Sequence, residues 1–547
     1  MTFQMTQTQQ RYIKTDIISF LNKKGRKIVA CYDYSSDTTR TEPVILIPPA
    51  YGDTKRDGLF LAYYLVANGF RVLRTDSTDS IGESDGEMLN YSMVTAKEDI
   101  EASVDYIEKE FDQSKVCVIS TSLAVRQAIK ASREDKRIFF VIGLVGVVDL
   151  QKTLHKIYGE DVIEKLSKGE SLDSEIVNTF GFDMSVEGLR SAILGQMHTI
   201  KTTQDDLKES KVPTILYFSE KDPWVQYDDI DISFLRNVEK RYIVGGMHEL
   251  RENPSVVRTL MRSVVVDLKK QYFGLGQTNV NEPDLREITK QNRREKERFK
   301  TFEFDKEAEF DFWESYLQEY HVIESTKEFK ELLNQLREEM LPLHKEDIFL
   351  DVGCGIGLIG EALFRKDSFN FNYIALDLVP NALKEAYQRN ISELLFGLKK
   401  GEAKPQPIYL SWDIEKNKIP FQRVSKICCN LVLSYLMNPK KILNELKELL
   451  IPGGKILISS LKPYVDLSPI YSNLISSASD NDLLVRARKL LSGAGIIKQK
   501  EKEGHYKFFS DEDLVLLLAE AGFINIKTQR AFSDQVIIAT ADKPNLP

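Results

Sequence analysis

The sequence predicts an α/β protein with two domains, each built on a largely parallel sheet. Two observations predict this class. Strand patterns alternate with helical patterns through both halves of the chain, as expected of parallel sheets covered by helices. The 547 residues also exceed what one hydrophobic core holds, and a polar, charge-rich stretch divides the alternation. We expect domains at 1–272 and 305–547, joined by a linker at 273–304.

Composition narrows the functions that the chain can have. The residues are 42% hydrophobic and 29% charged, as in globular proteins, and the net charge of −8 argues against nucleic acid as the main ligand. No run is apolar and long enough for a signal peptide or a membrane span, so we expect a soluble, cytoplasmic protein. The five cysteines lack metal-ligand spacing, so we expect reduced thiols and no metal site.

Each element of the first half follows from a short apolar run or a helical period. A helix is expected at Leu59–Asn68 and another, closing the domain, at Val264–Tyr272. The expected strands are Lys27–Tyr32, Pro43–Pro49, Gly69–Asp76, Val116–Ser120, Phe139–Val145, Thr214–Ser219 and Lys240–Val244.

One strand of this series runs directly into a helix through Ser122. Small residues, Ser120 and Ala124, stand two positions to either side, where glycines are usual. A small-x-Ser-x-small turn is what a nucleophile elbow requires, because strand and helix meet closely around an exposed hydroxyl. The alternative is that Ser122 only caps the helix.

Two further residues would complete a catalytic triad. Asp222 follows the strand Thr214–Ser219, and His248, one of six histidines, lies in a glycine-loosened loop after the next strand. The chain order Ser, Asp, His, with each residue at the carboxyl end of a strand, is that of α/β-hydrolases. His248 would take the proton of Ser122, and Asp222 would hold the imidazole tautomer.

An oxyanion formed at Ser122 needs preorganised donors. The sequence offers the backbone N–H of Leu123, directly after the nucleophile, and one near Ala50 and Tyr51 in the loop after the first central strand.

Residues 12–270 as a whole resemble the acyltransferases of bacterial bioluminescence, which are acyl carrier protein thioesterases. Besides the triad, the likeness is carried by Leu61–Leu65, Asn68–Val72, Thr75–Ser77, Gly146–Leu150 and Trp224–Val225. The resemblance implies an α/β-hydrolase fold and a fatty acyl or polyketide thioester on acyl carrier protein or coenzyme A. It also implies that 151–205 caps an apolar acyl tunnel, although core packing explains the apolar residues there equally well.

The second half opens with a buried strand that ends in an acid and a glycine-rich turn. Asp351, Gly353, Gly355 and Gly357 alternate with other residues before a helix begins. A carboxylate at this strand end would repel the pyrophosphate of a dinucleotide, and it suits a cofactor with a cationic end. The next strand ends in Asp377, which is placed to accept hydrogen bonds from both ribose hydroxyls.

Together these stretches resemble class I S-adenosylmethionine methyltransferases, and the likeness covers about 305–542. It implies a Rossmann-like fold with S-adenosylmethionine as cofactor. Asp351 would lie by the ammonium group, and Asp413 would hold the adenine amino group. Asn430 stands where the family often has an acid, and Leu378 and Ile414 complete the expected cofactor residues.

The methyl acceptor is less well defined by the sequence. Residues 310–340 are helical by period and present Trp313, Tyr316 and Tyr320 on one face, which either closes the site or packs it. The insert Pro463–Ser510 is expected to shape the acceptor pocket, with His505 or Tyr506 as a base. Its basic residues Arg486, Arg488 and Lys489 either meet an acyl carboxylate or form a solvated helix face.

The sequence therefore predicts a serine thioesterase or acyltransferase fused to a methyltransferase. The simplest scheme releases an acyl chain through Ser122 and methylates the freed acid to a methyl ester. Two alternatives stay open: methylation of a carrier-bound chain on oxygen, nitrogen or carbon before release, and a silent first domain that delivers substrate. Chain length, carrier and oligomeric state are not determined by the sequence.

Overall fold

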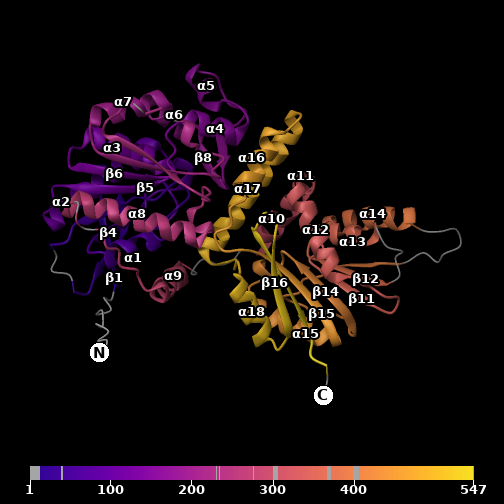
Figure 1. The fold of residues 1–547 in the computed structure, drawn as a ribbon. Coiled ribbons are helices and arrows are strands. Elements are labelled where there is room, and N and C mark those ends of the chain that lie inside the picture. Colours follow the sequence, from indigo (N-terminus) through magenta and orange to yellow (C-terminus); the bar gives the residue numbers. More distant parts are fainter. Residues whose placement is uncertain are drawn as a thin grey trace, which may run out of the picture. The chain divides into compact units, whose positions relative to one another are not determined.

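The computed structural model describes residues 13–37, 41–229, 231–232, 234–274, 276, 278–299, 306–365, 371–397 and 406–545. The chain divides into two compact units, Met1–Glu297 and Arg298–Pro547. Each unit is built on its own sheet (Figure 1).

The first unit contains an eight-stranded sheet in the order β1-β2-β4-β3-β5-β6-β9-β10. β1 pairs antiparallel with β2, β2 pairs antiparallel with β4, and the remaining pairs are parallel. The strands are β1 (Ile13–Leu21), β2 (Lys27–Ser35), β3 (Val44–Ile47), β4 (Arg71–Thr75), β5 (Val116–Thr121), β6 (Ile138–Leu144), β9 (Thr214–Ser219) and β10 (Val238–Ile243). All the strands expected in this half are present.

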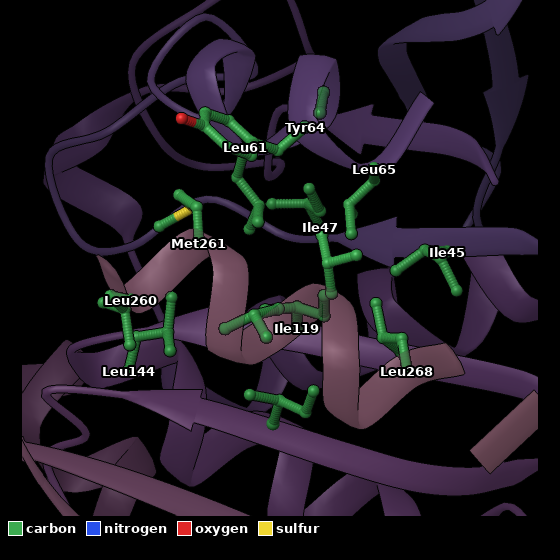
Figure 2. Close-up of a cluster of buried hydrophobic side chains, with 14 of the residues drawn as sticks. Ile45, Ile47, Leu61, Tyr64, Leu65, Ile119, Leu144, Leu260, Met261 and Leu268 are labelled. Atoms are coloured by element: carbon green, nitrogen blue, oxygen red, sulfur yellow. The ribbon is translucent and has the colours of Figure 1, made fainter. Parts of the chain in front are cut away.

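Helices cover both faces of this sheet because successive strand residues point to opposite sides. Ile45 and Ile47 lie in a cluster with helices α1 (Leu59–Ala67) and α8 (Pro254–Phe273), whereas Val44 and Leu46 lie in a cluster with α2 (Met93–Phe111) and α3 (Leu123–Glu134). Figure 2 shows Leu260 and Leu268 of α8 beside side chains of the sheet. Both faces are thus buried, and the functional groups are confined to the strand ends.

The segment between β6 and β9 forms the expected cap region. It consists of α4 (Leu150–Tyr158), α5 (Val162–Ser167), the hairpin of β7 (Ile176–Thr179) and β8 (Phe182–Ser185), α6 (Val186–Leu194) and α7 (Ile200–Ser210). Short 3-10 turns lie at Met88–Asn90, Tyr227–Asp229 and Leu250–Glu252.

Part of the stretch expected to be a solvated connector is instead helix α9 (Leu285–Phe299). Ile288 of α9 packs with Leu59 and Tyr63 of α1. Glu295 pairs with the fully buried Arg74, whose guanidinium also pairs with Asp33. A buried cation needs such partners, so α9 belongs to the first unit up to its last residues.

The second unit contains a seven-stranded sheet in the order β13-β12-β11-β14-β15-β17-β16. β17 pairs antiparallel with both neighbours, and the other pairs are parallel. The strands are β11 (Ile348–Val352), β12 (Asn372–Asp377), β13 (Ile408–Ser411), β14 (Val424–Asn430), β15 (Leu450–Leu461), β16 (Ile524–Ala531) and β17 (Val536–Asp542).

The helices of this unit are α10 (Lys306–Gln318), α11 (His321–Glu324), α12 (Lys327–Met340), α13 (Leu358–Phe364), α14 (Pro380–Gly397), α15 (Pro439–Leu449), α16 (Ser468–Ser476), α17 (Asn481–Glu503) and α18 (Asp511–Glu520), with a 3-10 turn η4 at Leu433–Tyr435. The helical stretch expected at 310–340 is therefore broken into three helices. Among the described residues, no helix is both long and apolar enough to cross a membrane.

Candidate active sites

Ser122 occupies a sharp turn between β5 and α3. Its backbone has φ 51° and ψ −126°, a combination that is costly for a non-glycine residue and is typical of a nucleophile elbow. Ser120 and Ala124 are fully buried, so the flanking positions admit only small side chains. Ser122 makes no side-chain capping bond to α3, which is a correction to the alternative that it only caps the helix.

The side chains of Ser122, His248 and Asp222 form a continuous hydrogen-bonded relay. Ser122 Oγ lies 2.9 Å from His248 Nε2, and His248 Nδ1 lies 2.7 Å from Asp222 Oδ2. The other oxygen of Asp222 accepts the backbone N–H groups of Trp224 at 2.9 Å and Val225 at 3.1 Å. Asp222 is buried and His248 is partly exposed, so the relay opens to solvent at the serine end.

The predicted oxyanion donors lie at the start of a helix and in the loop after β3. Leu123 is the first residue of α3, and the first N–H groups of a helix have no partner within it. Tyr51 lies in the loop after β3, and its phenol donates to the carbonyl of Phe182 at 3.4 Å. The loop that carries the second expected donor is therefore tied to the cap hairpin.

A charged contact joins that loop to the loop of the triad histidine. The guanidinium of Arg251, three residues after His248, donates to Asp57 Oδ1 at 3.3 Å and to Glu249 Oε1 at 2.7 Å. Asp57 in turn accepts the backbone N–H of Thr54 at 2.9 Å. The sequence analysis did not identify Arg251, because no local pattern marks a contact between residues so far apart in the chain.

The segment between β6 and β9, which the sequence predicts to be a cap, contacts the loops at this end of the sheet. Leu154, Ile157, Tyr158, Val162, Ile163 and Leu166 are buried, and Phe180 and Phe182 are partly exposed. Phe182 packs edge-on against Tyr51, and Phe180 packs edge-on against Trp224, next to the triad aspartate. The two phenylalanines of this segment thus contact the loop after β3, which carries the predicted oxyanion donor, and the residue two positions after Asp222.

In the second unit, the glycine turn after β11 folds back over the end of β12. Gly353 and Gly355 have φ of 68° and 51°, which only glycine adopts readily. A Cβ at Gly353 would lie 2.2 Å from Val432 Cγ2, whereas one at Gly355 would meet only Leu317 Cδ2 at 3.5 Å. Gly353 is therefore required by packing, and Gly355 leaves space beside the turn.

Asp351 is buried and only half satisfied. Its Oδ2 accepts the Tyr373 hydroxyl at 2.7 Å, whereas Oδ1 is buried and has no hydrogen-bond partner among the described residues. Burial raises the pKa of this carboxyl to about 7, with a further increase from the nearby Asp377 and a decrease from the Tyr373 hydroxyl. An orphaned buried carboxylate oxygen fits a cationic ligand group, such as the ammonium that the sequence predicts here.

Asp377 holds the glycine turn in place. Its two oxygens accept the N–H of Gly355 at 2.7 Å and of Val379 at 2.9 Å, and burial raises its pKa. Each carboxylate oxygen has a second lone pair, so these bonds leave capacity for ribose hydroxyls.

The remaining predicted cofactor residues border the same sheet edge. Asp413 Oδ1 accepts the N–H of Glu415 at 3.0 Å, and Asn430 Oδ1 accepts the Ser459 hydroxyl at 2.6 Å. Gly357 precedes α13, Leu378 is exposed, and Ile414 packs against the core cluster. The structure brings the expected set to one edge, and their contacts to a cofactor stay a prediction.

Several residues that were expected to bind or deprotonate the methyl acceptor are paired with other side chains of the protein. Arg486 pairs with Asp482 and Glu319, and Lys489 also pairs with Glu319, so these cations are already neutralised. Tyr506 is buried and donates its hydroxyl to Glu309, and burial with the nearby Glu309 raises its pKa. A phenol held as a donor is a poor general base, so the suggestion that Tyr506 deprotonates an acceptor is not supported.

Two family models match the chain. Residues 23–301 match the acyl transferase family, and residues 321–528 match a methyltransferase domain.

Several relatives of the first unit are acyl transferases. One from Photobacterium leiognathi is 29% identical over 273 residues, which are 47% of this chain and 81% of the relative. A second acyl transferase of that species is 30% identical over 246 residues, covering 42% of this chain and 76% of the relative. One from Vibrio harveyi is 29% identical, covering 42% and 76%.

Solved structures are also similar to the first unit. Ferulic acid-bound Est1E of Butyrivibrio proteoclasticus is 16% identical, with a TM-score of 0.38 over 46% of this chain and 98% of that one. The α/β hydrolase GrgF of a Penicillium species is 14% identical, with a TM-score of 0.38 over 48% and 100%. The two mainly parallel sheets with their helices, together with the two family matches, confirm the predicted α/β class for both halves. The chain belongs to the acyl transferase family and carries a methyltransferase domain after it.

Proposed function

We propose that this enzyme releases a fatty acyl or polyketide chain from a carrier-protein or coenzyme A thioester and then methylates the freed acid. The observation that carries the proposal is the relay from Ser122 through His248 to Asp222, with distances of 2.9 Å and 2.7 Å. A serine hydroxyl is a weak nucleophile unless an adjacent base accepts its proton, and this geometry supplies that base.

Acyl transfer follows from these contacts. His248 Nε2 accepts the proton as Ser122 Oγ bonds to the thioester carbonyl, and the N–H of Leu123 and one from the Ala50–Tyr51 stretch would stabilise the oxyanion. The C–S bond then breaks, and the thiolate leaves with the proton from His248. Water enters, gives its proton to His248, attacks the ester and displaces Ser122, which regains its proton as the acid departs.

The second unit would hold S-adenosylmethionine at the glycine turn. Asp351 would take the ammonium group on its unpartnered oxygen, Asp377 the ribose hydroxyls and Asp413 the adenine amino group. When bound, this cofactor supplies an electrophilic methyl group on a sulfonium. A carboxylate acceptor carries its own lone pair, so the chain needs to align it and to exclude water.

The test uses the full chain with a panel of acyl thioesters and S-adenosylmethionine, followed by mass spectrometry of the products. We expect the free acid and its methyl ester, and neither with the Ser122→Ala variant. If methylated chains instead remain on the carrier of that variant, methylation precedes release. If a fluorophosphonate probe fails to label Ser122, the first domain is silent and the proposal fails.

A further inference from the structure

The loop between β3 and α1 is held to the sheet by buried side chains at Lys55. The backbone N–H of Lys55 donates to Asp76 Oδ1 at 2.7 Å, and its carbonyl accepts a hydrogen bond of 2.6 Å from Arg74 Nη1. The Lys55 side chain is buried, and its ammonium group pairs with Asp76 and with Glu83. Because both backbone groups of Lys55 are bound, Arg74 and Asp76 set the course of the loop at this residue.

The guanidinium of Arg74 is itself fixed by two carboxylates. Its Nε and Nη2 donate to Asp33 of β2 at 2.6 and 3.0 Å, and its Nη1 and Nη2 donate to Glu295 of α9 at 3.4 and 3.2 Å. Together with the bond to Lys55, these contacts account for all five N–H groups of the side chain. A guanidinium is a rigid planar fork, so the two carboxylates together fix the direction of the N–H that holds the loop.

The same loop carries the predicted second oxyanion donor, near Ala50 and Tyr51. A backbone turn joins that stretch to Lys55, since the N–H of Asp53 donates to the Ala50 carbonyl at 3.0 Å. A shift of the loop at Lys55 would therefore move the predicted donor as well. An oxyanion donor acts only at hydrogen-bond distance from the charge that it stabilises, so such a shift would weaken it.

Glu295 is needed to keep the Arg74 guanidinium in this orientation. Without Glu295, Nη1 and Nη2 of Arg74 would each lose an acceptor, in a side chain that is fully buried. A buried charged donor without an acceptor is costly, so the guanidinium would turn toward another acceptor or toward water, and the Lys55 carbonyl would move with it. Asp33 would not prevent this turn, because it binds only the edge formed by Nε and Nη2.

We propose that Glu295 is a positioning residue for acyl transfer at Ser122. By holding the guanidinium of Arg74, it fixes the Lys55 carbonyl and keeps the donor of the loop after β3 within reach of the oxyanion. The inference rests on the proposed function and adds to it a residue from the last helix of the first unit. Helix α9 thus supports the reaction as well as the fold.

The test measures the rate of each active site. The full chain hydrolyses an acyl thioester, thiol release gives kcat and KM, and titration with an alkyl fluorophosphonate counts the reactive Ser122 side chains. Glu295→Ala should lower kcat per labelled site about tenfold, because a displaced donor stabilises the transition state less well. KM should stay nearly unchanged, because the oxyanion is absent from the bound substrate.

A transition-state analogue supplies a measurement that a purely structural role of Glu295 would not change. Ser122 Oγ adds to the carbonyl carbon of an alkyl trifluoromethyl ketone, and the resulting oxyanion uses the same donors as the substrate. The inhibition constant of this ketone should rise in Glu295→Ala by about the same factor as kcat falls. A purely structural role would lower the melting temperature and the number of labelled sites, with kcat per site unchanged.

Two further variants sharpen the test. Glu295→Gln keeps the length of the side chain but turns an amide NH2 group toward Arg74, so one of the two hydrogen bonds is lost. We expect kcat per labelled site to fall about threefold, and this variant carries the test if Glu295→Ala does not fold. Glu287→Ala is the matched control, since Glu287 is exposed on the same helix, and it should retain the wild-type kcat.

Three results would overturn the assignment. They are an unchanged kcat per labelled site in the Glu295 variants, a loss confined to KM, and an equal loss in the Glu287→Ala control. Wild-type protein that neither reacts with the fluorophosphonate nor hydrolyses any thioester would instead count against the proposed function. The two failures are distinguishable, because the first is observed with an active wild-type enzyme.

Discussion

The two candidate sites of this chain are built in opposite ways. In the first unit, the Ser122 hydroxyl, both nitrogens of His248 and both oxygens of Asp222 have partners within the protein. In the second, Asp351 keeps one buried oxygen without a partner among the described residues, and the glycine turn leaves space at Gly355. The first site is complete in its own side chains, and the second leaves a buried carboxylate oxygen and a space that a ligand could fill.

The difference follows from the chemistry that each site supports. A side-chain nucleophile must be aligned before substrate arrives, and the strained backbone of Ser122 together with the relay fixes it. A site whose reactive group belongs to a bound cofactor must leave space for that cofactor and a charged group without a partner to bind it. Mutation of the relay in the first unit should therefore lower activity without lowering stability. Mutation of the glycine turn or Asp351 in the second unit should change the affinity for the ligand.

The largest expected effect is that of Ser122→Ala. Removing the nucleophile should lower thioester hydrolysis on the order of 10⁶-fold in kcat, while the affinity for S-adenosylmethionine stays unchanged. Hydrolysis is followed by thiol release and cofactor affinity by calorimetry. Ser120→Ala is the matched control, because Ser120 is buried two residues away and its hydroxyl has no hydrogen-bond partner in the described part of the chain. A parallel loss of cofactor affinity would contradict the independence of the two sites.

Two glycines of the turn after β11 should differ in their roles: Gly353 is required for packing, whereas Gly355 leaves space for a ligand. Gly353→Ala should destabilise the free protein by about 2–5 kcal/mol, from the left-handed backbone and the clash with Val432. Gly355→Ala should lower the free energy of unfolding by only about 1–2 kcal/mol, because only the left-handed backbone is strained. It should nevertheless weaken cofactor binding, because the added methyl group occupies the space beside the turn. Denaturant unfolding and calorimetry measure the two effects. Val432→Ala should partly rescue Gly353→Ala, and equal destabilisation by both alanines would refute the distinction.

The unpartnered carboxyl predicts a pH dependence of cofactor binding. With a pKa of about 7 in the free protein, Asp351 is protonated below that pH and cannot pair with an ammonium group. As the pH is raised toward 7, the affinity for S-adenosylmethionine should therefore increase by up to about tenfold per pH unit. In this range, binding should release the proton of Asp351. Calorimetry in buffers of different ionisation enthalpy measures that proton, and Asp351→Asn should abolish the dependence.

The same raised pKa has a consequence for the ligand-free protein. Because the folded state holds this proton between the ordinary carboxyl pKa of 3.8 and about 7, the free energy of unfolding should fall as pH rises through that window. Asp351→Asn should flatten this slope relative to the wild type, and an unchanged slope would show that Asp351 does not titrate there.

The smallest expected effect concerns the contact between the two loops of the first site. Arg251→Ala should lower kcat for thioester hydrolysis several-fold with little change in KM, because Asp57 would no longer tie the oxyanion loop to the histidine loop. Arg251→Lys should restore part of the rate. Arg258→Ala is the control, since Arg258 is exposed and pairs with Glu282 outside the site. A change confined to KM would argue against a positioning role.

Local patterns carried most of the prediction from sequence. Ser122 directly follows β5, Asp351 is the last residue but one of β11, and Asp377 ends β12. These positions can be recognised in the sequence because a buried apolar run gives way to a polar group at the sheet edge. The alternation of strand and helix then restricted the topology to parallel sheets. The residues that meet at a strand end could be anticipated because parallel strands end at one edge.

Contacts between distant segments were not accessible in this way. Val432 fills the space that Gly353 leaves, and Arg251 reaches Asp57, but nothing in the local sequence marks either pair. The stretch 273–304, predicted to be a linker, also contains a contact that the local sequence does not mark. Its charge run resembles a solvated connector, and only the buried Arg74 explains why Glu295 of that run turns inward.

Helix α9 also bears on where the acyl transferase part can be separated from its neighbour. A fragment cut at 272 would remove Glu295 and leave the fully buried Arg74 with one carboxylate fewer, and it would uncover Tyr64, which bonds Glu282. The acyl transferase match likewise extends to residue 301. The boundary between the two compact units thus lies in the last turn of this helix, between Glu297 and Arg298, and a separated acyl transferase fragment should keep the helix.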